Sequence, residues 1–201
     1  MVKKKSIYLI FLLVLVVHGC AINELQQDLN QEQTSTIDQA SDEALVLDKH
    51  NELREYLGLP YLSWSDQVAK DAQNYADTLA SNGKFEHDKG SYTNGPYGEN
   101  LYSVKKSFSY EATLLEAVES WAAEIDFYNY EDNSCSVSPS SPKSIGLIPY
   151  STCGHYTQII WKDTSYVGCA KARYKTGSFK NGYVVVCKYK KPGNIVSQKP
   201  Y

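Results

Sequence analysis

The sequence has no excess of positive charge and no apolar run long enough to span a membrane. It contains 20 Lys and Arg against 23 Asp and Glu, and its formal net charge is -3. The first 19 residues hold three lysines and no acid, so their removal leaves a more acidic chain. Because nucleic-acid binding depends on basic surfaces that neutralise phosphates, we expect no nucleic-acid partner.

The apolar run from Ile7 to Val17 follows a basic segment of three lysines. A membrane-spanning helix needs roughly 20 apolar residues, so this run is too short to be one. It is typical of the hydrophobic region of a signal peptide. We therefore predict that residues 1–19 are a signal peptide and that the protein is exported to a compartment where disulfides persist.

Two kinds of cleavage fit the end of this leader. Val17-His18-Gly19-Cys20 resembles the lipobox of bacterial lipoproteins, in which Cys20 would be lipidated and attach the chain to a membrane. The count of five cysteines favours this, because it leaves one without a disulfide partner. An ordinary signal-peptidase cut after Gly19 or Ala21 is the alternative. The predicted location is accordingly extracellular, either secreted or lipid-anchored at the cell envelope.

Residues 20–42 contain no Lys, Arg or aromatic residue and are rich in Gln, Asn, Ser, Thr and acids. A segment of this composition buries too little apolar surface to fold. We predict a flexible acidic and polar tether, followed by one domain over residues 43–201. That domain is long enough to bury a core, and we expect it to be monomeric.

Three stretches of the domain have the apolar spacing of amphipathic helices. They are predicted over residues 43–57, from Ser65 to Asn82-Gly83, and over residues 110–128. In the third helix, Trp121 and Ile125 are expected to face the core, with Glu124 beside Trp121. Residues 84–106 are predicted to be a long connection, and a loop of this length is more often functional than idle.

Two strands are predicted over residues 166–174 and 182–190, on either side of the turn-rich residues 175–181. If this hairpin is symmetric about Ser178, Cys169 stands opposite Cys187. Facing residues of antiparallel strands lie close enough for a disulfide.

The hairpin pairing leaves Cys135 to pair with Cys153 across residues 129–152, which are rich in Ser and Pro and are predicted to be irregular. Four cysteines allow three pairings, and Cys169–Cys187 with Cys135–Cys153 is the one that the hairpin geometry favours.

Four stretches resemble, in the same order, those of the CAP superfamily, whose SCP domain is shared by cysteine-rich secretory proteins, antigen-five allergens and plant pathogenesis-related proteins. They are His50-Asn51-Glu52-Leu53-Arg54, Gly98-Glu99-Asn100-Leu101, Gly154-His155-Tyr156-Thr157-Gln158-Ile159-Ile160-Trp161 and the closing residues 186–201. The resemblance covers about residues 44–201. It implies an α+β fold, namely a three-layer α-β-α sandwich with a central, mainly antiparallel sheet, and the family's disulfide pattern agrees with the pairing above. Lys188 stands where the family usually has Asn.

In many members of this family, two His and two Glu line a broad cleft. The resemblance carries these roles to His87, Glu99, Glu124 and His155. Two neutral imidazoles can hold a divalent ion such as Zn²⁺, so His87 and His155 are the predicted metal ligands. Glu99 and Glu124 would orient the imidazoles or, in an enzyme, transfer protons.

Each of these residues also has a plainer interpretation. His155 could bond a loop, His87 could be merely exposed, and Glu99 could brace its loop by accepting backbone N–H bonds. Glu124 could be an ordinary solvated helix residue. His50 lies on the apolar face of the first helix, where a core histidine with satisfied hydrogen bonds is the expectation.

The aromatic residues Phe127, Tyr128 and Tyr130 form a second candidate site. In fungal relatives, an aromatic-rich loop in this region is associated with sterol binding, and aromatic side chains suit flat apolar ligands. The alternative is that these rings cap the core behind the third helix.

These observations favour an exported protein that binds a sterol, a fatty acid or a similar apolar molecule, with a divalent metal in the cleft. The alternatives are a metal-dependent hydrolase that uses the same four residues and a non-catalytic surface interaction module. The sequence contains no HExxH or CxxC spacing and no Gly-x-Ser-x-Gly elbow, so it identifies no nucleophile. Binding is therefore preferred to turnover.

Overall fold

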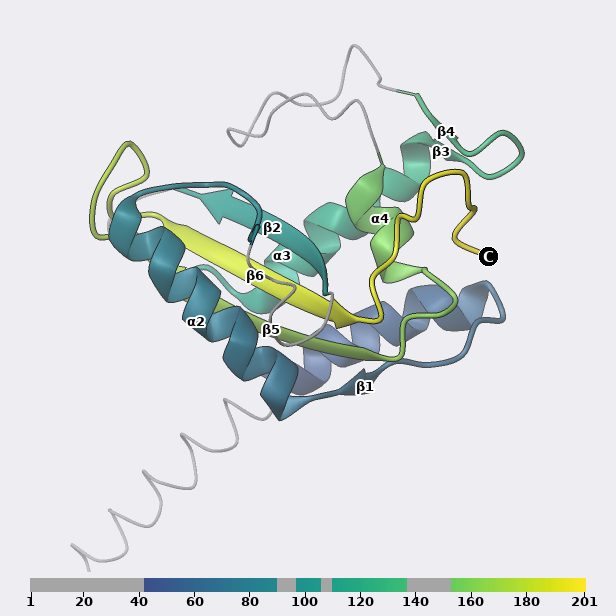
Figure 1. Cartoon of the computed structure of the whole chain (residues 1–201), viewed down its shortest axis with the longest axis horizontal. Helices are drawn as coiled ribbons and strands as arrows, with labels where there is room; N and C mark the ends of the chain where they lie inside the picture. The colour runs from purple at the N-terminus through teal and green to yellow at the C-terminus, as the bar shows by residue number, and fades with distance from the viewer. Residues whose placement is uncertain (1–41, 90–96, 106–109, 137–152) are drawn as a thin grey trace, which may run out of the picture. The chain divides into compact units, whose positions relative to one another are not determined.

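A four-stranded sheet in the order β1-β5-β6-β2 lies at the centre of the domain (Figure 1). This computed structural model describes residues 42–89, 97–105, 110–136 and 153–201. The strands are β1 (Ser63–Trp64), β2 (Gly98–Val104), β5 (Tyr166–Arg173) and β6 (Tyr183–Lys190). β6 pairs antiparallel with both β5 and β2, and β1 pairs parallel with β5. The predicted mainly antiparallel sheet is confirmed.

The register of the predicted hairpin is also confirmed, since Cys169 faces Cys187 across β5 and β6. The prediction of a continuous loop over residues 84–106 is wrong, because Gly98–Val104 form the edge strand β2. Its first residues, Gly98-Glu99-Asn100, are poor strand formers on their own. Pairing with β6, far along the chain, supplies the hydrogen bonds that hold them extended.

Helix α2 (Asp66–Asn82) has the ends that the sequence predicts. The side chain of Ser65 accepts a bond from the Val68 backbone N–H, and Gly83 ends the helix in a left-handed conformation at φ 66°. The first helix covers residues 42–56, close to the predicted 43–57.

The third predicted helix, over residues 110–128, is wrong in its length. The α-helix α3 covers only Leu114–Ala122, and a 3₁₀ helix, η1 (Ala123–Phe127), continues it. A 3₁₀ helix has fewer residues per turn than an α-helix, so its side chains point in other directions. As a result Glu124 is buried, whereas Ile125, predicted to face the core, is exposed.

The sheet separates two helical layers, so the predicted α+β sandwich is confirmed (Figure 1). Helix α2 covers one face, where Gly168 of β5 has no room for a side chain because a Cβ would lie 2.2 Å from Ala69 N. The helix over residues 42–56, α3 and α4 (Gly154–Ile159) cover the other face. The larger core cluster lies in this second layer and includes Val46, Val118, Trp121, Ile159, Val185 and Tyr189.

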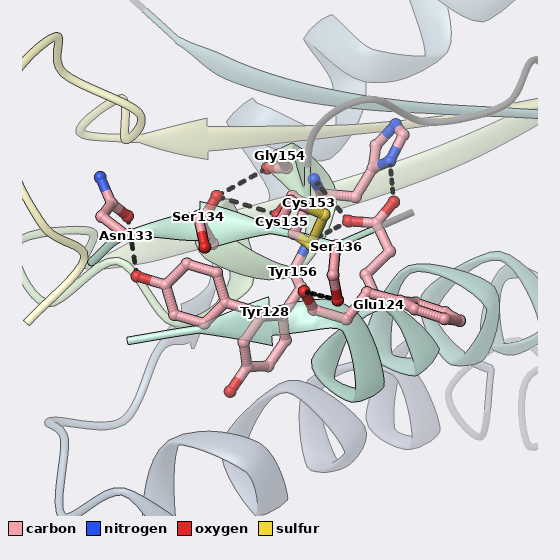
Figure 2. Close-up of a disulfide and its surroundings, with 12 residues drawn as sticks. Glu124, Tyr128, Asn133, Ser134, Cys135, Ser136, Cys153, Gly154 and Tyr156 are labelled. Carbon is pink, nitrogen blue, oxygen red and sulfur yellow. Dashed lines mark hydrogen bonds and ion pairs between the residues drawn. A yellow bond between two sulfur atoms is a disulfide. The ribbon is translucent and has the colours of Figure 1, made fainter. Parts of the chain in front are cut away.

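Both predicted disulfides are present, Cys135–Cys153 and Cys169–Cys187. Cys135 lies on β4 (Ser134–Cys135), which pairs with β3 (Tyr128–Asn129), so the start of the segment predicted to be irregular is a short hairpin. The disulfide joins this hairpin to the start of α4 (Figure 2).

Several sequence-based predictions lie outside the described residues. They are the signal peptide over residues 1–19, lipidation of Cys20, most of the tether over residues 20–42 and the structure of residues 137–152. Within the described ranges, the structure has no helix that is long and apolar enough to cross a membrane.

Candidate functional site

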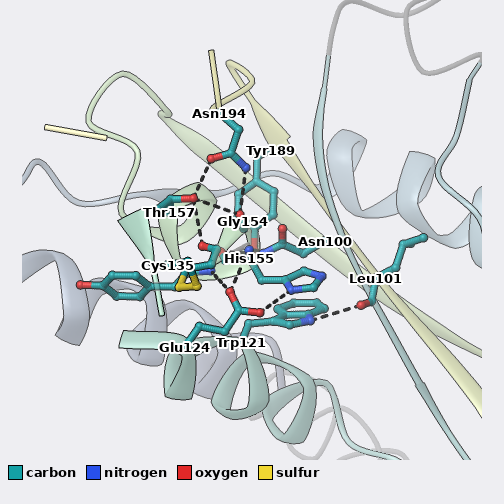
Figure 3. Close-up of polar contacts among 12 residues, drawn as sticks. Asn100, Leu101, Trp121, Glu124, Cys135, Gly154, His155, Thr157, Tyr189 and Asn194 are labelled. Carbon is teal, nitrogen blue, oxygen red and sulfur yellow. Dashed lines mark hydrogen bonds and ion pairs between the residues drawn. A yellow bond between two sulfur atoms is a disulfide. The ribbon is translucent and has the colours of Figure 1, made fainter. Parts of the chain in front are cut away.

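The first of the predicted histidines, His155, is held by Glu124 (Figure 3). Glu124 Oε1 lies 2.7 Å from His155 Nδ1, and Oε2 accepts the backbone N–H bonds of His155 and Tyr156, each at 3.0 Å. These N–H groups belong to the first turn of α4 and have no partner within that helix. Glu124 therefore caps α4 from η1 and also orients the imidazole.

Aromatic packing holds the same histidine from the other side. The Trp121 ring stacks on the His155 ring at a centroid distance of 5.8 Å and an interplanar angle of 14°. Trp121 Nε1 donates to the carbonyl oxygen of Leu101 on β2 at 3.3 Å. Only 15% of the His155 side chain is exposed. Its position is thus set by α3, α4 and β2 together (Figure 3).

The second pair, His87 and Glu99, has the same contact in a different setting. His87 Nδ1 lies 2.7 Å from Glu99 Oε1, which also accepts the Asp88 backbone N–H at 3.1 Å. The Glu99 side chain is buried, but 66% of the His87 side chain is exposed. Glu99 Oε2 accepts no hydrogen bond from the described residues, and Lys188 Nζ lies 3.6 Å away from it. The predicted bracing role of Glu99 and its contact with His87 occur together.

Strand β2 separates the two pairs. Successive side chains of a strand point to opposite faces, so Glu99 and Asn100 diverge. Glu99 stands opposite Lys188 on β6. Asn100 donates instead to the His155 carbonyl oxygen at 3.1 Å and to the Tyr189 hydroxyl at 3.2 Å. The four predicted residues therefore form two His–Glu pairs. Glu99 of β2 belongs to one pair, and the next residue of the strand, Asn100, contacts His155 of the other.

The donor chemistry of both pairs suits a divalent ion. A carboxylate on Nδ1 is typical of histidines that bind zinc through Nε2, because it fixes the ring and makes it a better donor. His87 and His155 would be the ligands, and the ion would supply Lewis acidity. Among the described residues, however, no three His, Cys, Asp or Glu side chains form a group that could hold a metal. The metal site stays a prediction.

The plainer prediction for His50 is confirmed. This residue is fully buried, with Nδ1 2.8 Å from the Val46 carbonyl oxygen and Nε2 2.9 Å from the Tyr189 hydroxyl. Burial lowers its pKa to about 4. Because Tyr189 also accepts from Asn100, His50 supports the strand that carries Glu99.

A pocket of about 410 Å³ opens beside the Cys135–Cys153 disulfide. Its walls come from the β3–β4 hairpin, the start of α4 and the C-terminal segment. The lining residues are Tyr128, Asn133, Ser134, Cys135, Cys153, Gly154, Thr157, Trp161 and residues 194–198. Sequence reasoning missed the C-terminal wall, although the apolar pair Ile195-Val196 in a polar tail was a visible signal.

One of the three predicted aromatic ligand-binding residues lines this pocket. Tyr128 does so, and its hydroxyl donates to Asn133 Oδ1 at 2.8 Å (Figure 2). Burial raises the pKa of Tyr128 to about 12, so it stays a neutral donor. Tyr130 instead stacks on Tyr201 at 4.5 Å and holds the C-terminus, while the Phe127 carbonyl oxygen accepts from Ser136.

The family model for the cysteine-rich secretory protein family, CAP, matches residues 47–189. The chain belongs to the CAP family. Pathogenesis-related protein 1C of Nicotiana tabacum is 33% identical to it over 192 residues, which are 96% of this chain and 90% of that protein. The recognition of the family from four short stretches is confirmed.

Solved structures show the CAP fold as well. Venom allergen-like protein 4 of Schistosoma mansoni, SmVAL4, has a TM-score of 0.55 and 21% identity, covering 80% of this chain and 93% of its own. The structure of NaASP2 with Zn²⁺ has a TM-score of 0.56 and 21% identity, and the match covers 79% of this chain and 84% of NaASP2.

Proposed function

We propose that this CAP protein is exported and binds a small, mainly apolar ligand such as a sterol or a fatty acid in the pocket beside Cys135–Cys153. The observation that carries the proposal is the pocket itself. Its volume of about 410 Å³ lies in the range of small-molecule sites. Its walls come from three separate parts of the chain, and the disulfide joins two of them, the β3–β4 hairpin and the start of α4.

The chemistry of the lining suits a ligand with an apolar body and a polar end. Tyr128, Trp161 and Ile195 offer apolar surface, and Val196 on the same wall is 89% exposed. Because these side chains line one pocket, they form a contiguous apolar surface that a ligand can cover. Thr157 Oγ1 donates to Asn194 Oδ1 at 2.7 Å, and the exposed Asn194 amide donates one N–H to the Gly154 carbonyl oxygen. These bonds orient the Asn194 amide, whose second N–H can donate to a hydroxyl or carboxylate group.

Binding without turnover agrees with the contacts of Glu124. Both oxygens of Glu124 are engaged, by two backbone N–H groups and one imidazole. A carboxylate that caps a helix in this way is poorly placed to accept a proton from a substrate. The hydrolase alternative therefore receives no support from Glu124. The remaining alternative, a non-catalytic interaction module, is the conclusion if the binding test below finds no lipid binding.

The test is equilibrium binding of radiolabelled cholesterol and palmitate to the full chain. Tyr128→Ala removes an aromatic wall, and Val196→Asp places a charge on the apolar rim. Each should weaken binding by roughly tenfold, because about 1.4 kcal/mol of apolar contact is lost. Tyr166→Ala removes an exposed tyrosine that is not part of the pocket and should leave binding unchanged.

If the native chain binds neither lipid, or if all three variants bind equally well, the proposal fails and an interaction module is the better description. Mass spectrometry of the mature N-terminus separates the two modes of export. An acylated Cys20 means a lipid anchor, and an unmodified end at Cys20 or later means a free secreted protein.

A further inference from the structure

The buried ammonium group of Lys188 lies beside the His87–Glu99 pair. Its Nζ is 2.6 Å from Asp88 Oδ2 and 3.6 Å from Glu99 Oε2, and only 2% of the side chain is exposed. The strand register places Lys188 directly opposite Glu99. This positive charge is therefore a fixed part of the fold, unlike the charge of a mobile surface lysine.

Two tyrosine rings face the same ammonium group. The ring centroids of Tyr75 and Tyr97 lie 5.1 and 5.6 Å from Lys188 Nζ, within the range of cation–π attraction. The Tyr97 hydroxyl donates to Asp71 Oδ2 at 2.9 Å, which anchors that ring to α2. The surroundings of Lys188 are thus built to hold a single cation.

Glu99 connects this cation to the predicted metal ligand. One of its oxygens contacts His87 Nδ1, and the other faces Lys188. A divalent ion on His87 would gain less from Glu99, because the ammonium group already offsets the charge of that carboxylate. It would also be repelled by Lys188, whose ammonium group is buried and held in place by Asp88.

We infer that Lys188 is a specificity-determining residue of the His87–Glu99 pair. It lowers the affinity of this pair for divalent cations by supplying a resident positive charge at Glu99. This role of Lys188 does not depend on the apolar ligand proposed for the pocket beside Cys135–Cys153. Lipid binding can fail while this inference holds, and the reverse is also true.

Lys188→Met tests the inference, because it removes the charge and keeps an unbranched side chain. Titration calorimetry of the full chain with zinc chloride should show binding tighter than that of the native chain by roughly tenfold or more. Zinc should also raise the melting temperature of K188M more than that of the native chain. Lys188→Arg keeps the charge and should retain the native affinity for zinc.

Lys190→Met is the matched control, since it removes an exposed lysine two residues further along β6 and should leave zinc affinity unchanged. The gain should disappear in H87A/K188M. Because K188M leaves Asp88 without this ion pair, D88N/K188M provides a second background with a neutral pair. The inference is overturned if both backgrounds fold, by circular dichroism, and bind zinc no more tightly than the native chain. It is also overturned if the gain survives loss of His87.

Discussion

The two His–Glu pairs share one contact and differ in almost everything around it. In both, a carboxylate oxygen lies 2.7 Å from Nδ1 of the imidazole. The His155–Glu124 pair is stacked on Trp121 and bonded to the backbone of α4. The His87–Glu99 pair has an exposed ring on one side and a buried ammonium group on the other.

This difference shows that the same His–Glu contact can have two different structural roles. Glu124 is part of the framework, because its loss would leave two backbone N–H groups of α4 without an acceptor. Glu99 is part of a charge balance, because it shares a buried setting with Lys188 and Asp88. The first pair should therefore respond to mutation mainly in stability and the second mainly in ion binding.

The largest expected effect comes from removing Glu124. In Glu124→Ala, the N–H groups of His155 and Tyr156 lose their acceptor, and each unsatisfied buried group costs roughly 1–3 kcal/mol. We expect a loss of about 4 kcal/mol in the free energy of unfolding, measured by urea denaturation. A loss below about 1 kcal/mol would show that water or a shift of α4 satisfies these groups, and the contrast between the pairs would collapse.

The next effect concerns His50, whose two ring nitrogens both lie against buried partners. Its pKa is about 4 in the fold against 6.5 for an ordinary histidine, because burial disfavours the charged form. The unfolded chain thus takes up the proton first as the pH falls. The free energy of unfolding should be highest above about pH 6.5, and protonation of His50 should decrease it by roughly 3 kcal/mol as the pH falls towards 4.

Urea denaturation at several pH values measures this dependence. Arg54, buried nearby, stays charged throughout and adds to the cost of protonating His50. His50→Gln should flatten the curve between pH 4 and 6.5. A slope that persists in H50Q would assign the acid sensitivity to other groups.

A smaller effect is expected from Glu99→Gln, the counterpart of the Glu124 variant. The amide retains an acceptor for His87 and Asp88 N–H but removes a negative charge from Lys188, which keeps Asp88 as a partner. We expect a loss of about 1 kcal/mol in the free energy of unfolding. Glu119→Gln, at an exposed position of α3, is a control for the loss of a glutamate charge elsewhere and should leave the free energy of unfolding nearly unchanged. A loss as large as that of Glu124→Ala would show that Glu99 also belongs to the framework.

The smallest effect should come from His87→Ala. With two thirds of its side chain exposed, His87 forms an ion pair that water screens. The free energy of unfolding should change by less than about 0.5 kcal/mol. His155→Ala, by contrast, should cost more, because it removes the ring that stacks on Trp121. Equal losses in thermal denaturation of the two variants would contradict the distinction between the pairs.

The elements that the sequence predicted well have their signals within a few residues. Ser65 and Gly83 cap the two ends of α2 and so set its length. The register of the hairpin follows from the turn that joins β5 to β6. Strand β2 was missed because its stability comes from β6, which lies far along the chain. The end of α3 was missed because the change to a 3₁₀ turn accompanies the contacts of Glu124 with α4, and these are also remote in sequence.

The sequence by itself determined the family and both disulfides, because these depend on short motifs and on one local hairpin. The family resemblance also selected four His and Glu residues as a predicted site. Only the tertiary structure decided how those four residues are grouped. Alternation along β2 is a local property, but what meets Glu99 on one face and Asn100 on the other depends on β6, α2 and α4. For the same reason Lys188, an unremarkable lysine in the sequence, becomes a buried cation against Glu99 once the strands pair.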